Sequence, residues 1–211
     1  MEFIEARFNA ALIMDSNSTV EIPSSSMASS NTLGQYDTEL GQCREIFEAK
    51  VRDYGTSWRI MRPIALTDQL YIKARRIRTL QEGAERKIDE GVEGEFQGIV
   101  NYAIIALIQL ELGWHGDFAL SEERVQALYK EKAAGIRELM QAKNHDYGEA
   151  WRDMRVEGIT DLILTKLLRV RTIEANGGRV EVSEGIDSHY SDMANYALFA
   201  LILLSEQEQR A

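Results

Sequence analysis

Cysteine, proline and long apolar runs are all scarce in this sequence, and each shortage excludes a class of protein. The single cysteine, Cys43, excludes an internal disulfide framework and favours a reducing compartment, so we expect a cytoplasmic protein. The longest apolar runs, residues 99–110 and 193–204, are shorter than the roughly 20 residues that a membrane-spanning helix needs. The acidic start of the chain lacks the pattern of a signal peptide. We therefore expect neither membrane insertion nor export.

Basic residues are in the minority, with 24 Lys and Arg against 34 Asp and Glu and a net charge of -10. This balance disfavours stable binding to DNA or RNA polymers, whose phosphates attract basic surfaces. The chain has only two prolines among 211 residues, and its 45% hydrophobic content is enough for a packed core. Its many Ala, Leu, Glu and Arg residues favour helices. We predict an all-α protein.

The sequence does contain an unusual string that is written twice. Residues 50–62, KVRDYGTSWRIMR, match residues 143–155, KNHDYGEAWRDMR, at eight of thirteen positions. The same offset of 93 aligns residues 67–79 with residues 160–172 at six of thirteen positions. Each half therefore has the same predicted order: a helix, the DYG turn, a short helix, another helix and a long apolar helix.

The last apolar segment is repeated as well. Residues 101–112 match residues 195–206 at seven of twelve positions, with an offset of 94 because one residue is inserted between the blocks. Both segments are apolar almost all round, which predicts two buried helices that pack against each other. We predict a tandemly duplicated helical bundle with internal pseudo-two-fold symmetry, which resembles a dimer within one chain. A homodimer of the whole chain is left open.

The composition divides the chain into three segments. Residues 1–35 are expected to be a disordered leader, or a segment added upstream of a natural start at Met27, because residues 15–35 are rich in Ser, Asn and Thr without periodicity. Residues 36–113 form the first helical repeat and residues 114–211 the second. The two repeats are expected to form one compact domain.

Local signals predict where helices begin and end. Thr67 and Thr160 stand directly before apolar helical patterns, where N-caps are expected. Gly55 and Gly148 are expected to end the preceding helices in the left-handed conformation. Ser121 is expected to cap the first helix of the second half.

Polar side chains are repeated along with the apolar pattern, and packing alone does not require that. Arginine makes forked contacts to phosphate, lysine supplies a point charge, and tryptophan can stack on a base. We therefore predict a phosphate-binding or nucleotide-binding site. Its candidate residues are Lys50, Asp53, Tyr54, Trp58, Arg59, Lys73, Arg76 and Asn101 in the first half and Lys143, Asp146, Tyr147, Trp151, Arg152, Lys166, Arg169 and Asn195 in the second.

A structural role is the alternative for each of these residues. The cations can neutralise nearby aspartates such as Asp68 and Asp161, and the tryptophans can fill the core. Asn101 and Asn195 lie inside the apolar helices, where a buried amide needs hydrogen-bond partners. They either fix the register between paired helices or orient a ligand.

Two acidic residues are candidates for a metal site. Glu184 and Asp192 lie eight residues apart, and they share one face if their helix begins early. Mg²⁺ takes oxygen ligands of this kind. The first half has Glu90 and Gly98 at the matching places, so the second half is the better candidate. The alternative is that Glu184 and Asp187 interact with the positive end of the helix while Asp192 pairs with an arginine.

The strings KNHDYGEAW, TDLILTKLLRV and SEGIDSHYSDMANYALFA resemble the family named nucleotide-modification-associated domain, first type, formerly a domain of unknown function. The resemblance spans residues 37–205, and in particular it resembles two-copy bacterial members with DYGxxW, TDxxxxK and NYA in each half. It implies a role in nucleotide metabolism or base modification. Glu45 with Glu48, and Glu184 with Asp187, also resemble the paired acidic patterns of MazG-type nucleotide pyrophosphatases.

These observations favour a protein that binds a nucleotide or a related phosphorylated small molecule. If it is an enzyme, we expect a Mg-dependent nucleotide (pyro)phosphohydrolase. Glu184 and Asp192 would hold the metal, while Lys166 and Arg169 would stabilise charge on the phosphate. The alternative function is a non-catalytic helical structural or interaction module.

Overall fold

The computed structural model describes residues 25–83, 91–116, 118–181 and 184–210. Within these ranges it contains six α-helices and two short 3-10 helices, and no strands. They are α2 (Ser25–Tyr54), η1 (Ser57–Ile60), α3 (Pro63–Gln81), α4 (Val92–Leu112), α5 (Glu122–Tyr147), η2 (Ala150–Asp153), α6 (Val156–Ala175) and α7 (Ile186–Glu208). The prediction of an all-α protein, with the same order of helices in each half, is confirmed.

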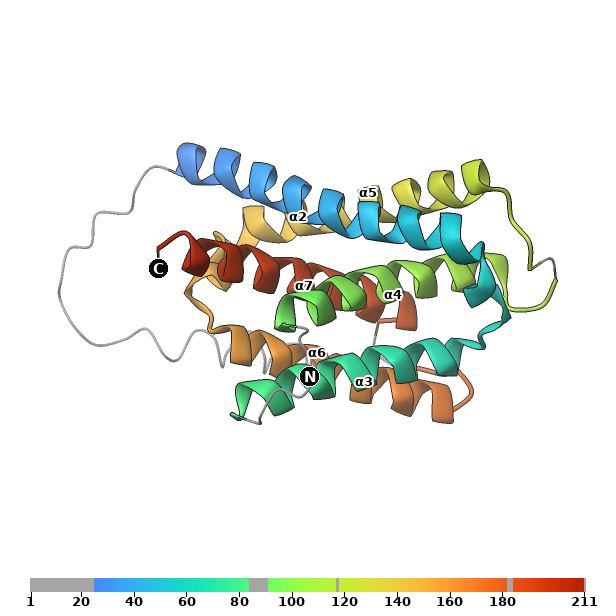
Figure 1. The fold of residues 1–211 in the computed structure, drawn as a ribbon. Helices are drawn as coiled ribbons and strands as arrows, with labels where there is room; N and C mark the ends of the chain where they lie inside the picture. Colours follow the sequence, from blue (N-terminus) through green and yellow to red (C-terminus); the bar gives the residue numbers. More distant parts are fainter. Residues whose placement is uncertain (1–24, 84–90, 117, 182–183, 211) are drawn as a thin grey trace.

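Helices α4 and α7 form the middle of three layers (Figure 1). They contact each other more extensively than any other pair, with α2 and α5 on one side and α3 and α6 on the other. Side chains along both central helices are buried, including Ile104 and Leu198. A helix that is apolar all round is most stable in the centre, so the predicted packing of the two helices is confirmed. In the ranges given above, no helix is long and apolar enough to cross a membrane.

Each DYG string ends one helix and begins a 3-10 turn. Gly55 after α2 and Gly148 after α5 both have a φ of 61°, a left-handed conformation that favours glycine. The N–H of Gly148 donates to the carbonyl of Asn144. At the other end of α5, the hydroxyl of Ser121 accepts from the N–H of Arg124 at 3.3 Å. The predicted helix ends at these positions are confirmed.

Thr67 and Thr160 do not cap helices, so this prediction is wrong. Helix α3 begins at Pro63, and both threonines lie one turn inside their helices. Proline suits the first position of a helix because no N–H is needed there. Both threonines are buried and join α3 to α6: Thr67 donates to Glu174 at 2.7 Å, and Thr160 accepts from Gln81 at 3.0 Å.

The predicted end of the disordered leader at residue 35 is also wrong. Helix α2 begins at Ser25, and Thr32 is buried. The side chain of Gln35 donates to Glu206 of α7 at 2.8 Å. Such tertiary contacts stabilise a helix whose serine-rich sequence has little helix propensity of its own. The rest of the predicted leader, residues 1–24, lies outside the described residues.

Two asparagines tie the outer helices to the central pair. In α4, Asn101 accepts from the hydroxyl of Tyr129 in α5 at 2.8 Å and donates to a main-chain carbonyl of α2. In α7, Asn195 accepts from the hydroxyl of Tyr36 in α2 at 2.7 Å and donates to a main-chain carbonyl of α5. Each asparagine therefore contacts both α2 and α5, which fixes the register of these two helices on the central layer.

Candidate functional site

A buried carboxylate that is shared by two lysines lies near the start of α7. The side chain of Asp192 is only 5% exposed; its Oδ1 accepts from Nζ of Lys143 at 2.5 Å and its Oδ2 from Nζ of Lys166 at 2.8 Å. Lys143 comes from the end of α5 and Lys166 from the middle of α6, so three helices of the second half meet here. We call Lys143, Lys166, Arg169, His189 and Asp192 the Asp192 cluster.

The Asp192 cluster carries more positive than negative charge. Burial alone would raise the pKa of the Asp192 carboxyl, but the hydrogen bonds and charges of Lys143 and Lys166 outweigh burial and lower that pKa. The carboxylate therefore stays ionised and balances one ammonium group. The second lysine leaves an excess of positive charge beside this carboxylate. Because Lys143 is 45% exposed, an anion in solution can reach its ammonium group.

His189 lies on the same helix, one turn before Asp192. Burial is the main cause that lowers the pKa of His189; Lys166 and Arg169 lower it further, whereas Asp192 and Glu184 act in the opposite direction. The ring is therefore neutral at pH 7. It is only 4% exposed, and neither ring nitrogen has a hydrogen-bond partner among the described residues. Buried polar groups without partners are costly, which makes His189 a candidate for contact with a bound molecule.

The first half holds a different ion cluster. The carboxylate of Glu95 in α4 is buried and accepts from Nζ of Lys73 at 3.1 Å and from the guanidinium of Arg76. The stem of Lys73 also occupies the space beside Gly98, where an added Cβ would lie 2.7 Å from its Cε. Lys73 and Arg76 therefore meet at a carboxylate of their own half, and their contact with phosphate stays a prediction.

The two halves differ in where the carboxylate stands. With the offset of 94 that aligns the central helices, Glu95 matches His189 and Gly98 matches Asp192. The carboxylate thus lies one helical turn later in the second half. Both Glu95 and His189 were missed by the sequence reasoning, which considered Glu90 and Gly98 instead. The offset was visible in the sequence and would have pointed to them; Glu90 itself lies outside the described residues.

The Asp and Tyr of the DYG strings are surface residues. Tyr54 is 70% exposed and Tyr147 is 71% exposed. Asp53 is exposed, and the carboxylate of Asp146 contacts its neighbour His145, at 3.2 Å. In the part of the chain that the structure describes, none of these side chains is hydrogen-bonded to the Asp192 cluster. Lys50, the counterpart of Lys143, is also exposed at the end of α2.

The tryptophans lie in the core, which agrees with their alternative structural role, and stacking on a base stays a prediction. Trp151 stacks on Phe199 of α7, with ring centroids 4.3 Å apart and an angle of 3° between the planes. The guanidinium of Arg152 lies 4.5 Å from the centroid of the Trp151 ring. These neighbours cover the ring surface that a base would need. Trp58 is buried as well. Large aromatic side chains contribute most to stability when they are packed in this way.

The arginines that follow the tryptophans bond to the ends of the central helices. Arg59 is buried and donates to the side chain of Gln109 and to the carbonyl of Gly113 at 2.9 Å. Arg152 donates to Glu206 at 2.8 Å and to Gln35 at 2.7 Å. Both guanidinium groups therefore have partners inside the protein. Their predicted contacts with phosphate stay a prediction.

Glu184 and Asp192 do not form the row of carboxylates that was predicted. Helix α7 begins at Ile186, so Glu184 precedes the helix and is exposed. Both oxygens of Asp192 accept from lysine ammonium groups, which stand where a cation would bind. Within the described residues, no group of three His, Cys, Asp or Glu side chains could hold a metal ion. As arranged, Glu184 and Asp192 do not fit a Mg²⁺ ion, and Mg²⁺ binding stays a prediction.

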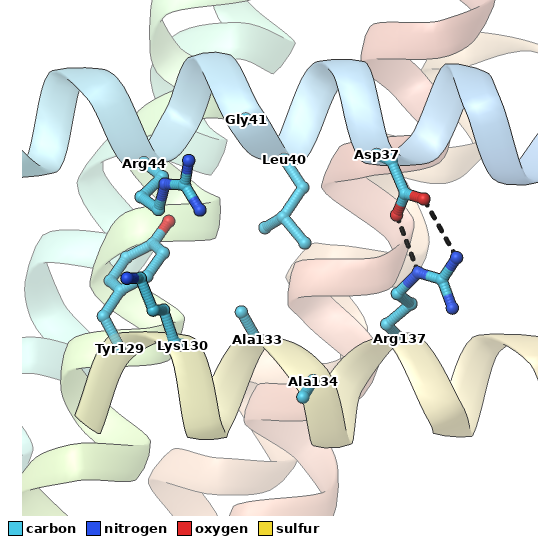
Figure 2. A pocket seen from close by; sticks show the side chains of 9 residues that line it. All are labelled: Asp37, Leu40, Gly41, Arg44, Tyr129, Lys130, Ala133, Ala134 and Arg137. Carbon is cyan, nitrogen blue, oxygen red and sulfur yellow. Dashed lines mark hydrogen bonds and ion pairs between the residues drawn. The ribbon is translucent and has the colours of Figure 1, made fainter. Parts of the chain in front are cut away.

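Two cavities lie apart from the Asp192 cluster. One, of about 300 Å³, lies between α2 and α5 and is bordered by Tyr129 and the ion pair of Asp37 with Arg137 (Figure 2). The other, of about 530 Å³, lies beside Arg152 and Glu206. Only Arg152 of the predicted phosphate-binding set lines either of them. The residues predicted to bind phosphate therefore do not line either cavity together.

Comparison with known proteins gives one match. A family model described as nucleotide modification associated domain 1 matches residues 50–110 and 143–204. The two matched segments include both DYG strings, both ion clusters and most of the two central helices. No curated protein and no solved structure matches the chain. The two segments confirm the predicted resemblance to two-copy members of this family.

Proposed function

Because the chain belongs to the nucleotide modification associated domain 1 family, we propose that it binds a nucleotide or a related phosphorylated small molecule at the Asp192 cluster. The observation that supports this proposal is the convergence of Lys143 and Lys166 on one buried carboxylate. Two ammonium groups beside a single carboxylate retain the capacity to bind a further anion. Phosphate oxygens are the acceptors that such groups bind best.

Lys143 is the side chain that can change partner most easily. It is 45% exposed, whereas Lys166 is 16% exposed and Asp192 is 5% exposed. A phosphate group that takes the ammonium of Lys143 leaves Asp192 paired with Lys166. No buried charge loses its last partner in this exchange, so the cost of an isolated buried ion is avoided.

Hydrolysis of the bound molecule is a further step of the proposal. Mg²⁺, for which Glu184 and Asp192 were the predicted ligands, would supply a polarised phosphate and an activated water only if these two residues were arranged differently from what the structure shows. Lys166 and Arg169 would stabilise negative charge on the phosphate. For this to happen, the lysines must first leave the oxygens of Asp192. Phosphate binding at the cluster does not depend on this step.

A helical structural or interaction module is the second candidate function. It is favoured by the contacts of the repeated polar residues, because Asn101, Asn195, Arg59 and Arg152 all bond to other helices or turns of the protein. Matched contacts in the two halves also support a tandem duplication with internal pseudo-two-fold symmetry, which is part of our proposal. We keep the expectations of a cytoplasmic location and of no stable nucleic-acid polymer as a partner, and a homodimer is left open.

Binding can be tested by thermal unfolding and calorimetry against inorganic pyrophosphate and a panel of nucleotides, each with and without Mg²⁺. A ligand that binds only the native state raises the melting temperature. Lys143→Ala removes one charged hydrogen bond and should weaken binding about tenfold. Lys130→Ala is the matched control, because Lys130 is an exposed lysine on the same helix outside the cluster.

Two results would contradict the proposal. The first is that no compound of the panel stabilises the wild-type protein, which would favour the structural module. The second is that Lys143→Ala binds as tightly as Lys130→Ala. Release of pyrophosphate that is lost in Asp192→Ala, in a protein that still folds, would support the hydrolytic step.

A further inference from the structure

We propose that only the second half of the chain binds the phosphorylated molecule, and that His189 contacts the phosphate. The first half has the carboxylate of Glu95 at the matching position. This inference rests on the proposed function and deepens it, because it assigns the contact between ligand and protein to one side chain and one chemical group. The two ion clusters differ in a way that supports this assignment.

The cluster of the first half is closed. Glu95 accepts from both Lys73 and Arg76, so the cations that match Lys166 and Arg169 already share a carboxylate. The stem of Lys73 fills the space beside Gly98. An incoming phosphate would have to displace the stem of Lys73, and it would have to compete with Glu95 for two cations that are only 24% and 28% exposed, whereas Lys143 in the second half is 45% exposed. The first half is therefore a poor anion site.

The second half has no carboxylate at the same position. His189 stands where Glu95 stands in the first half, so the residue that matches Lys73 turns instead to Asp192 at 2.8 Å. Neither ring nitrogen of His189 has a hydrogen-bond partner in the ranges that the structure describes, although the residue is only 4% exposed. This is a second, independent sign of a ligand, because a buried imidazole normally has at least one partner.

The chemistry of the ring indicates which part of the ligand it contacts. A neutral imidazole has one N–H donor, and the oxygens of an ionised phosphate are acceptors. Lys143 and Lys166 bring positive charge to the same place, so the phosphate chain fits here better than an uncharged base. Inorganic pyrophosphate should therefore bind without a nucleoside.

The proposal can be tested by giving the second half the side chain that the first half has at the matching position. His189→Glu copies the first half, because the new carboxylate can pair with Lys166 and Arg169 as Glu95 pairs with Lys73 and Arg76. We expect the variant to fold and to bind pyrophosphate at least about tenfold more weakly. His189→Gln keeps a donor without a charge and should lose less affinity. His115→Glu is the control, since it makes the same charge change at an exposed histidine.

Proton NMR gives a readout that a purely structural role would not produce. The chain has three histidines, so the ring signals can be assigned with His115→Gln and His145→Gln variants. Pyrophosphate should shift the His189 ring signals in the wild-type protein and leave those of His115 unchanged.

The outcomes separate this inference from the proposed function. If His189→Glu binds pyrophosphate as tightly as His115→Glu while Lys143→Ala binds more weakly than Lys130→Ala, the cluster is a phosphate site and the contact assigned to His189 is wrong. An unchanged His189 signal at saturating pyrophosphate would overturn it too. If wild-type protein binds no compound at all, both the proposed function and this inference are wrong.

Discussion

At the scale of single residues, two matched threonines have different partners. Thr67 donates to the carboxylate of Glu174, whereas Thr160 accepts from the amide of Gln81. Gln81 and Glu174 occupy the same place in the two halves, at the offset of 93. Burial is the main cause that raises the pKa of Glu174, and Asp68 raises it further. Its Oε2 is buried without a hydrogen-bond partner among the described residues.

We predict that Glu174→Gln stabilises the protein at pH 7 by on the order of 1 kcal/mol, because a neutral amide replaces a poorly solvated charge and can still accept from Thr67. The pKa of Glu174 is raised above the value of 4.5 for an unfolded chain, so the native state binds more protons near that pH. Stability should therefore fall as the pH rises from about 4.5 through the raised pKa. Denaturant titrations at several pH values will measure both effects.

The reciprocal change is the control for this prediction. Gln81→Glu places a carboxylate beside Thr160 and should destabilise the protein at neutral pH, with a smaller loss in acid. If Glu174→Gln lowers the melting temperature at pH 7, or leaves the pH profile unchanged, burial of this carboxylate does not limit stability.

At the scale of helices, the hydrogen bond between Tyr36 and Asn195 joins α2 to α7. We predict that Tyr36→Phe and Asn195→Ala each destabilise the protein by about 1 to 3 kcal/mol, because a buried polar group loses its partner. The two effects should not add, and a double-mutant cycle should give a coupling energy of about 1 kcal/mol. Chemical denaturation of the four proteins supplies the measurement.

A second cycle controls for general damage to the core. Tyr129 bonds to Asn101 and not to Asn195, so Tyr129→Phe and Asn195→Ala should be additive within about 0.5 kcal/mol. Equal coupling in both cycles would mean that the tyrosines act through packing and not through their hydroxyls.

Helix ends show how far the sequence determines local structure. Gly148 and Ser121 were predicted correctly because a left-handed glycine and a capping serine act on their own neighbours. The starts of α3 and α6 were not, since Thr67 and Thr160 resemble caps but bond across the α3–α6 contact. Whether such a threonine caps a helix or forms a buried contact depends on the packing of segments that are distant in the sequence. A local sequence pattern therefore does not predict it.

The candidate site shows the same limit. The sequence identified Lys143, Lys166 and Asp192 as site residues but did not reveal that they pair with one another. A carboxylate on a helix face can hold a metal ion or a lysine, and the partner is decided by side chains from α5 and α6. His189 was overlooked because it is a candidate only through the absence of hydrogen-bond partners at its two ring nitrogens among the described residues. Such an absence cannot be recognised without coordinates.

At the scale of the whole molecule, the two halves share one core. The helix pairs α4–α7 and α3–α6 each join one half to the other, and α4–α7 is the most extensive contact of the fold (Figure 1). Large apolar surfaces such as those around Ile104 and Leu198 would face water if the halves separated. Neither half has a complete core of its own.

We therefore predict that a chain cut between the halves stays assembled. A protease site inserted after Gly116, in the segment between α4 and α5, should give two fragments that elute together in gel filtration and keep the helical signal of the intact protein, because the buried contact between α4 and α7 does not depend on the connecting peptide. Each fragment expressed alone should be unfolded or should pair with a second copy of itself. The same protease site placed inside α4, after Ala103, should prevent folding. Fragments that separate in native buffer, each with full helical content, would mean that the halves are independent domains and that their shared core contributes little to stability.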